Sequence, residues 1–327
     1  MPVQIFTHTS EALRDNPLGD PNVRELHCIV PEGLSPEEPV GVLWYLSGYA
    51  GVSRGMLSGD PWQESLQARV TRLQNEGLLG PMIIALPDCF TKYGGSQFLD
   101  SPAQGQYETY LLKELREFIE SKFNVNGHAI AGKSSGGFGA LFHAMRNPGM
   151  FRAAVCHSGD LGFRFAHTGE LPLLMNGIHE HGGVENFVRA FEKAKKKKTG
   201  RWIGPMSMLA YAAAYSPDET QPLGIALPFD LETGQIDENV FSRWLALDPV
   251  EMIEKKECQE ALQALDLLFV DCGSRDEYHL QWGARGLKRK LESFDIEHVY
   301  QEFNDGHRST SYRLDVSLPL IYRALSG

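Results

Sequence analysis

Two kinds of hydrophobic pattern alternate along most of the chain. Short apolar runs bounded by turn residues predict buried strands at 23–30, 40–46, 82–86, 128–131, 152–157, 267–271 and 298–303. Amphipathic stretches predict helices at 62–76, 107–123, 137–146, 280–294 and 308–325. Strands that alternate with helices predict an α/β fold, with a mostly parallel sheet and helices on both faces. The first two strands lack a helix between them, so we expect an antiparallel start.

The alternation stops between residues 162 and 265. This stretch has helical patterns at 184–198, 206–215, 240–247 and 249–256, joined by connections rich in Gly and Pro, and no pattern typical of a buried strand. We therefore expect an α/β core formed by 1–161 and 266–327, and a helical insertion at 162–265. Ligands bind at the carboxyl edge of open α/β sheets, so the insertion is predicted to cover the site as a lid or cap.

A serine lies between the predicted strand at 128–131 and the predicted helix at 137–146. The segment Gly132-Lys133-Ser134-Ser135-Gly136 has the Gly-x-Ser-x-Gly pattern of a nucleophile elbow, where a strand turns sharply into a helix. Lysine stands two positions before Ser135, so Ser134 alone has both flanking glycines. Ser134 is therefore the candidate nucleophile. The motif by itself leaves open a Gly/Ser turn without a catalytic role.

A serine nucleophile needs a base, and the base needs an orienting acid. His307 follows the last predicted strand, and Gly306 permits a tight turn before it. Asp276 lies beyond the end of the strand at 267–271 and is the candidate acid. Glu277 is the adjacent alternative, and Asp271 is expected inside the strand. The order serine, acid, histidine is that of α/β-hydrolases.

An oxyanion hole needs two backbone N–H groups. The predicted strand at 40–46 is followed by a loop rich in glycine, where Gly48 permits a turn. We expect the N–H groups of Tyr49 and Ser135 to be the two donors. A plain glycine turn is the alternative for this loop.

Four segments resemble a known family: 16–21, 46–48, 87–96 and 132–159. The chain resembles the esterase D, S-formylglutathione hydrolase and enterochelin-esterase type of α/β-hydrolase, the Putative esterase family. The resemblance implies an α/β-hydrolase fold and a carboxylic ester hydrolase with Ser134, Asp276 and His307 as its triad. Two positions depart from the family pattern, because Ser135 replaces a common Met and Ser47 a common His. The insertion has no counterpart in the family, so the resemblance does not identify the substrate.

Two further groups of residues are candidates for the substrate pocket. Tyr93, Ser96 and Phe98 lie in the glycine-rich loop after the strand at 82–86, and a mobile surface loop is the alternative. Trp202 begins an apolar stripe in the insertion, for which core packing is the alternative.

Composition narrows the class of protein. The chain has 327 residues, 42% of them hydrophobic and 22% charged, as in soluble globular proteins. A net charge of −11 opposes binding to nucleic acid and to anionic membranes, so neither is an expected partner. The five cysteines are scattered and form no Cys-x-x-Cys pair. With no signal peptide pattern and no apolar run of about 18 residues, a cytoplasmic enzyme is expected.

Two clusters of polar and charged residues are explained without a binding role. Lys193 and 195–198 end a predicted helix, where lysines complement the helix dipole, and this interpretation is preferred to a nucleic-acid patch. His179-Glu180-His181 lacks the spacing of a helical zinc motif. No metal and no cofactor are expected.

The predicted function is that of a serine carboxylesterase that hydrolyses small to medium carboxylic or thio esters through an acyl-enzyme. Its expected partner is a small-molecule ester. Two alternatives remain: an acyltransferase with the same triad, and a binding protein with a hydrolase fold and no activity. The acyl and alcohol specificity, a homodimer and the motion of the insertion stay open.

Overall fold

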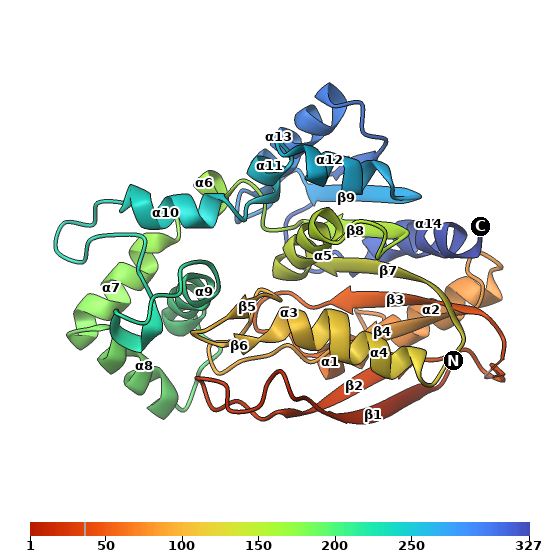
Figure 1. Cartoon of the computed structure of the whole chain (residues 1–327), viewed down its shortest axis with the longest axis horizontal. Helices are drawn as coiled ribbons and strands as arrows, with labels where there is room; N and C mark the ends of the chain where they lie inside the picture. Colours follow the sequence, from red (N-terminus) through yellow and green to blue (C-terminus); the bar gives the residue numbers. More distant parts are fainter. Residues whose placement is uncertain (36) are drawn as a thin grey trace.

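An eight-stranded sheet forms the centre of the molecule (Figure 1). The computed structural model describes residues 1–35 and 37–327. The strands lie in the order β1-β2-β4-β3-β7-β8-β9-β10. Neighbours from β4 to β10 pair in parallel, whereas β1–β2 and β2–β4 pair antiparallel. The bounds are β1 (Val3–Thr9), β2 (Val23–Ile29), β3 (Val40–Leu46), β4 (Met82–Leu86), β7 (Val125–Lys133), β8 (Ala153–His157), β9 (Leu267–Gly273) and β10 (Val299–Phe303). The short strands β5 (Asp100–Ser101) and β6 (Gly105–Gln106) form a separate ribbon.

All seven strands expected from the hydrophobic pattern are present, and the mostly parallel sheet is confirmed. The antiparallel start is correct in direction, but β4 lies between β2 and β3. The edge strand β1 is an additional strand. Its apolar residues give only a weak pattern because it lies at the edge of the sheet, where Ile5 is 59% exposed and Val3 and Phe6 are only half-buried.

Helices cover both faces of the sheet, as predicted. Successive side chains of β3 point to opposite faces, so Val42 and Trp44 belong to one hydrophobic cluster and Leu43 and Tyr45 to the other. One face packs against α2 (Leu66–Asn75) and α14 (Leu314–Ser326). The opposite face packs against the helices α3 (Tyr107–Thr109), η1 (Tyr110–Leu115), α4 (Arg116–Glu120), α5 (Ser135–Arg146) and α13 (Leu280–Ser293). Two short helices, α1 (Ser53–Leu57) and η3 (Ser311–Arg313), complete this part.

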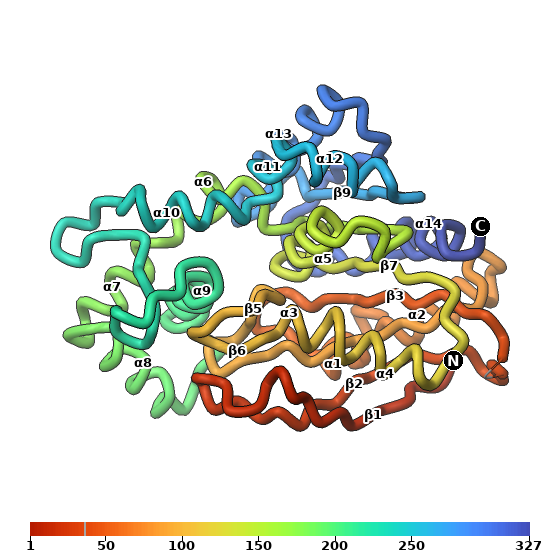
Figure 2. Tube along the Cα trace, viewed as in Figure 1, coloured from red at the N-terminus to blue at the C-terminus, as the bar shows by residue number. Residues whose placement is uncertain are grey.

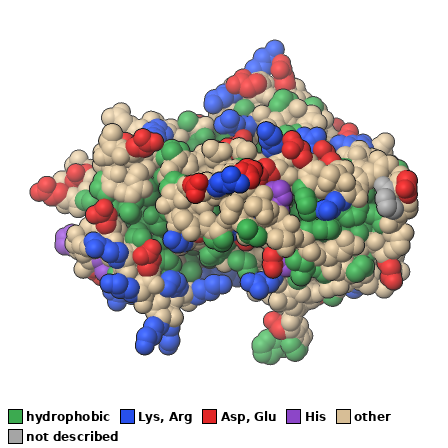
Figure 3. Space-filling model, turned by 60° about the horizontal axis from the view of Figure 1, so that its bottom comes forward, with side chains coloured by type: hydrophobic (Ala, Val, Ile, Leu, Met, Phe, Trp, Pro, Cys, Tyr) green, Lys and Arg blue, Asp and Glu red, His purple; other side chains and the backbone are tan. Residues whose placement is uncertain are grey.

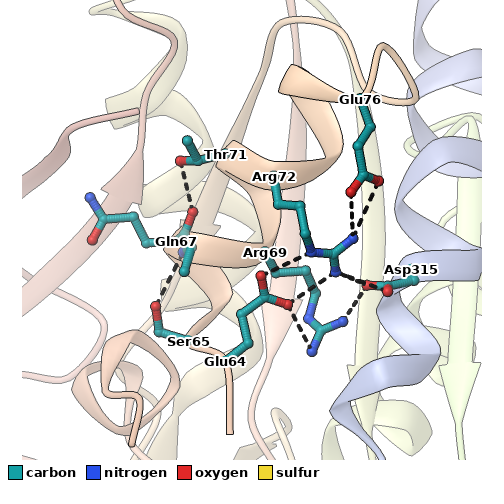
Figure 4. Close-up of polar contacts among 9 residues, drawn as sticks. Glu64, Ser65, Gln67, Arg69, Thr71, Arg72, Glu76 and Asp315 are labelled. Atoms are coloured by element: carbon teal, nitrogen blue, oxygen red, sulfur yellow. Dashed lines mark hydrogen bonds and ion pairs between the residues drawn. The ribbon is translucent and has the colours of Figure 1, made fainter. Parts of the chain in front are cut away.

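A network of ion pairs ties α2 to α14 (Figure 4). Nη2 of Arg72 lies 3.0 Å from Glu64 Oε2 and 2.9 Å from Asp315 Oδ2. Arg69, whose side chain is buried, contacts the same two carboxylates. A buried guanidinium needs such partners, and here they hold the two helices of one face together.

The helices of 162–265 fall into two groups. Helices α6 to α10 lie beyond the end of the sheet, at the side of the molecule opposite both termini (Figures 1 and 2). Helices α11 and α12 contact α5, and α11 also contacts α13, so they extend the helical layer over the sheet. The bounds are α6 (Phe163–Ala166), α7 (Leu171–His181), α8 (Val184–Lys193), α9 (Gly200–Tyr215), η2 (Pro222–Gly224), α10 (Glu238–Leu245), α11 (Pro249–Met252) and α12 (Lys256–Gln263). The division of the chain at 162 and 265 stays a prediction.

Candidate active site

Ser134 occupies a strained turn between β7 and α5. Its φ of 57° and ψ of −125° lie outside the regions that side-chain-bearing residues normally adopt. Two backbone hydrogen bonds hold it there, because its N–H donates to the carbonyl of His157 at 3.0 Å and its carbonyl accepts from the N–H of Phe138 at 3.0 Å. This strand-to-helix turn has the geometry of a nucleophile elbow.

The two glycines that flank Ser134 are required by close backbone approach. A Cβ at Gly132 would lie 2.3 Å from backbone atoms of Gly136. A Cβ at Gly136 would lie 2.1 Å from the carbonyl oxygen of Leu46. No such contact is tolerated, so the turn can form only when both positions lack a side chain.

The structure brings His307 and Asp276 together. Nδ1 of His307 lies 2.7 Å from Oδ2 of Asp276, whose other oxygen accepts the N–H of Tyr278 at 2.9 Å. The Asp276 side chain is fully buried, which protects this contact from water. Glu277, the alternative acid, accepts the backbone N–H of His307 at 2.6 Å and thus holds the loop.

Asp271 is oriented away from this pair. It lies within β9, as expected, and its carboxylate contacts Nδ1 of His157 and Nε of Arg313, both at 2.8 Å. Its partners belong to β8 and η3, and Asp271 therefore has a different environment from Asp276.

Ser134 and His307 line one cavity of about 630 Å³, together with residues of the 162–265 segment such as Met208 and Tyr211. Among the described residues, the hydrogen bond of the Ser134 hydroxyl is to Oδ1 of Asp160, at 3.4 Å. The structure therefore places Ser134 and His307 in the same cavity, with the serine hydroxyl directed toward Asp160.

The two predicted oxyanion-hole segments meet beside Ser134. Gly48 and Tyr49 line the cavity, and a Cβ at Gly48 would lie 4.0 Å from Oγ of Ser134. The N–H groups of Tyr49 and Ser135 have no protein acceptor within residues 1–35 and 37–327. The hydroxyl of Tyr49 donates to the carbonyl of Tyr93 at 2.7 Å, which fixes this loop. Two free donors near a nucleophile can stabilise an oxyanion, and this role stays a prediction.

Asp160 is a residue of the site that the sequence pattern did not indicate. It follows β8, and its N–H donates to the carbonyl of Ser134 at 3.3 Å. Oδ2 accepts the hydroxyl of Ser135 at 2.9 Å, and that hydroxyl lies 3.1 Å from Oη of Tyr211. Burial raises the pKa of Asp160, although the Ser135 hydrogen bond and nearby His307 oppose the rise. Its position directly after a predicted strand could have indicated a site residue. Only the pairing of β8 with β7, however, shows that Asp160 lies beside Ser134.

The four residues proposed for the substrate pocket do not line the cavity that contains Ser134. Tyr93 is buried and its carbonyl holds the Tyr49 hydroxyl. Ser96 and Phe98 border a space of only about 10 Å³ beside Ser135. Trp202 packs against other aromatic side chains of the segment: His181, Phe187 and Phe191. Packing against other parts of the protein thus explains why Tyr93, Phe98 and Trp202 do not line this cavity, although Tyr49 and Tyr211 do.

Cationic side chains gather on one face of the molecule despite its net charge of −11 (Figure 3). A second cavity of about 350 Å³ adjoins the first, and Lys133 and Lys198 line both. Burial lowers the pKa of Lys133, although the carboxylates of Asp276 and Asp271 oppose this effect. The helix predicted over 184–198 ends earlier, at Lys193, so the lysines of the 195–198 run lie beyond its last turn, where they are exposed.

Residues 1–35 and 37–327 contain neither a metal-binding cluster nor a membrane-spanning helix. No group of three or more His, Cys, Asp or Glu side chains in this part of the chain is arranged to hold a metal ion. No helix formed by these residues combines the length and the apolar character needed to cross a bilayer.

Comparisons with known proteins agree with this geometry. The family described as Putative esterase matches residues 24–313. Esterase Rv1288 and Esterase MT1326, from two strains of Mycobacterium tuberculosis, are each 34% identical over 93 residues, which is 26% of this chain. The matched part is 20% of the length of those relatives, so the chain spans only about a fifth of them.

Solved structures give the fold. A ferulic acid esterase superposes with a TM-score of 0.62 at 20% identity, over 99% of this chain and 98% of the other. An S-formylglutathione hydrolase from Agrobacterium tumefaciens has a TM-score of 0.62 at 16% identity, over 99% and 95% of the two chains. At these identities the likeness concerns the fold, and the expected α/β-hydrolase fold is confirmed.

Proposed function

The chain belongs to the Putative esterase family, and on that premise we propose that it is a serine carboxylesterase acting on small to medium carboxylic or thio esters. The observation that carries the proposal is the contact of 2.7 Å between Nδ1 of His307 and Oδ2 of Asp276. His307 also lines the same cavity as Ser134, whose backbone is strained. A histidine held by a buried carboxylate is the base that an elbow serine requires.

The proposed reaction begins when the Ser134 hydroxyl turns from Asp160 toward Nε2 of His307. This rotation is a change between staggered side-chain positions, and catalytic hydrogen bonds often form only in the substrate complex. His307 takes the hydroxyl proton as Oγ attacks the carbonyl carbon, while Asp276 accepts the Nδ1–H and stabilises the imidazolium.

The negative charge that develops on the carbonyl oxygen is stabilised by the N–H groups of Tyr49 and Ser135 in this proposal. His307 then protonates the leaving alcohol or thiol, and the acyl group remains on Ser134. Water, activated by His307, attacks the acyl-enzyme and releases the acid.

Replacement of the nucleophile tests the function. Ser134→Ala is expected to lower kcat for a p-nitrophenyl ester by about 10⁴-fold to 10⁶-fold and to leave the circular dichroism spectrum unchanged, because only the attacking atom is removed. A fluorophosphonate is expected to label the wild-type protein and the control Ser326→Ala, but not Ser134→Ala. Wild-type hydrolysis by purified Ser134→Ala would show that the assignment is wrong.

The same assay separates hydrolysis from acyl transfer. With added alcohols, a hydrolase yields mainly the free acid, whereas an acyltransferase yields a new ester. Product analysis by mass spectrometry therefore decides whether water is the preferred acceptor.

A cytoplasmic location is also proposed, supported by five cysteines that are all buried as free thiols. Fractionation of cells that express the full-length native gene tests it, and recovery outside the cytoplasm would contradict it.

A further inference from the structure

Asp160 lies within reach of the acyl group that Ser134 would carry. Its Oδ1 is 3.4 Å from Oγ of Ser134, and both residues line the same cavity. In an acyl-enzyme, the carbonyl oxygen faces the N–H groups of Tyr49 and Ser135, and the leaving group departs on the side of His307. The acyl chain takes the third direction, which we assign to the wall formed by Asp160 and Tyr211.

Distances along the acyl group match this wall. An atom bound to the carbon next to the carbonyl lies about 3 Å from Oγ, as ordinary bond lengths require. A nitrogen or oxygen at this position can therefore approach Oδ1 of Asp160 to hydrogen-bond distance. A donor group further along the acyl chain would lie beyond Oδ1.

Acylation removes the donor that Asp160 has in the free enzyme. Among the described residues, Oδ1 has one hydrogen bond, from the Ser134 hydroxyl, and that proton is lost when Oγ forms the ester. The side chains of Gln97 and Tyr211 also lie within hydrogen-bonding reach of the carboxyl and oppose the rise of its pKa, and Oδ2 keeps its bond from Ser135. A buried carboxyl oxygen without a donor is unfavourable, so a donor on the acyl group is favoured.

His167 also lines this cavity. Its Nε2 is buried and has no hydrogen-bond partner within the described part of the chain. Its ring lies 5.0 Å from that of Tyr211. Burial lowers the pKa of His167 to about 3, so the ring is neutral at pH 7 and offers a polar contact without charge.

We propose that Asp160 selects acyl groups with a hydrogen-bond donor, an ammonium or a hydroxyl, on the carbon next to the reacting carbonyl. The inference rests on the proposed esterase function and names the substrate class of that site. Esters of α-amino and α-hydroxy acids belong to the class, whereas simple alkanoyl esters leave Oδ1 without a donor.

A matched ester series tests this selection. Alanyl, lactoyl and propionyl esters of one alcohol differ mainly at the carbon next to the carbonyl. At pH 7, kcat/KM for at least one of the alanyl and lactoyl esters is expected to exceed that for the propionyl ester by about 10-fold to 100-fold, the factor typical of one hydrogen bond to a charged group. Each value is divided by the rate of hydroxide hydrolysis of the same ester, which removes the intrinsic reactivity of the substrate.

Variants of Asp160 distinguish the two donors. The preference is expressed as kcat/KM for the alanyl or lactoyl ester divided by kcat/KM for the propionyl ester. Asp160→Leu is expected to bring both of these ratios close to one, because it removes the acceptor at similar volume. Asp160→Asn is expected to lower the alanyl preference more than the lactoyl preference, since its amide oxygen still accepts from a hydroxyl. Asp218→Asn, a substitution at a surface turn, serves as control and should retain the wild-type ratios.

The outcomes separate this inference from the function on which it rests. Ratios close to one in the wild-type protein, with Ser134 labelled by fluorophosphonate, would overturn the inference and leave the esterase proposal intact. If Asp160→Leu is labelled by fluorophosphonate but keeps the wild-type preference among the three esters, the inference is likewise overturned and the esterase proposal stands. Absence of both hydrolysis and labelling in the wild type would overturn the two together.

Discussion

At the scale of the residue, the turn at Ser134 restricts which side chains the flanking positions can hold. The positive φ of Ser134 and the contacts that a Cβ would make at Gly132 and Gly136 arise from the same sharp turn. A strand that passes into a helix without a loop must bring backbone close to backbone. Small residues are therefore a geometric requirement here.

Substitution of Gly136 tests this requirement. Gly136→Ala is expected to lower kcat/KM by about 100-fold or more, because displacement of the elbow misplaces Oγ. It should also lower the free energy of unfolding by about 1–3 kcal/mol, as overpacking does. Gly169→Ala is the matched control, since a Cβ there meets nothing within 4 Å. Equal behaviour of the two variants, measured by steady-state kinetics and urea unfolding, would contradict the argument.

The orienting acid can be identified in a similar way. Asp276→Asn is expected to reduce kcat by about 10³-fold to 10⁴-fold with little change in KM, because the neutral amide stabilises the imidazolium poorly and its NH₂ group can donate to Nδ1, which favours the wrong tautomer of His307. Glu277→Gln changes a carboxylate that accepts the backbone N–H of His307 rather than its ring, so its effect on kcat should be below about 10-fold. A larger loss in Glu277→Gln than in Asp276→Asn would favour the alternative acid.

At the scale of the element, Asp248 joins two short helices of the 162–265 segment. Its carboxylate accepts the N–H groups of Gly162 at 3.0 Å, Phe163 at 2.6 Å and Val250 at 3.0 Å, and thus caps α11 while it holds the start of α6. Helices of four residues have too few internal hydrogen bonds to be stable alone. Such a junction stabilises both.

Removal of this carboxylate should be costly. Asp248→Ala is expected to lower the free energy of unfolding by about 2–3 kcal/mol, because it leaves buried N–H groups without an acceptor. Asp218→Ala removes a turn carboxylate at the surface and should lower the free energy of unfolding much less. Urea unfolding measures both, and a similar cost for the two would mean that Asp248 has no special role.

At the scale of the whole molecule, α9 connects the 162–265 segment to the sheet domain. Its residues from Met206 to Tyr215 are buried. The carbonyl of Ala213 accepts the hydroxyl of Ser101 at 2.5 Å, and the hydroxyl of Tyr215 accepts the side-chain amide of Gln97 at 2.7 Å. These contacts describe a helix that is part of the core, with α7 and α8 further out (Figure 1).

Hydrogen exchange is expected to reflect this arrangement. Amides of α9 should be about as well protected as those of β7, whereas α8 and residues 195–198 should exchange much faster, because they have fewer buried neighbours. Mass spectrometry of peptic fragments can make this measurement. If α9 exchanged as fast as α8, the whole segment would open together as a lid.

Much of the fold and of the candidate site follows from local patterns. The seven strands, the helices that cover the sheet and the elbow at Ser134 could be predicted because each depends on the periodicity or spacing of nearby residues, whereas α7 and most of α12 were not predicted. Asp276 and His307 could be proposed because parallel strands end at a common edge, and the structure places them 2.7 Å apart. The edge strand β1 gave too weak a pattern to be identified.

Other features were decided only by the tertiary structure. Asp160 reaches Ser134 because β8 lies beside β7, and neither the sheet order nor this contact can be derived from local spacing. Trp202 and Phe98 do not line the cavity, because Trp202 packs against Phe187 of α8 and Phe98 lies against Gly139 of α5. Sequence by itself determined the chemistry that is available and its order along the chain. Packing decided which side chains meet, because contacts between distant residues depend on how all the elements fit together.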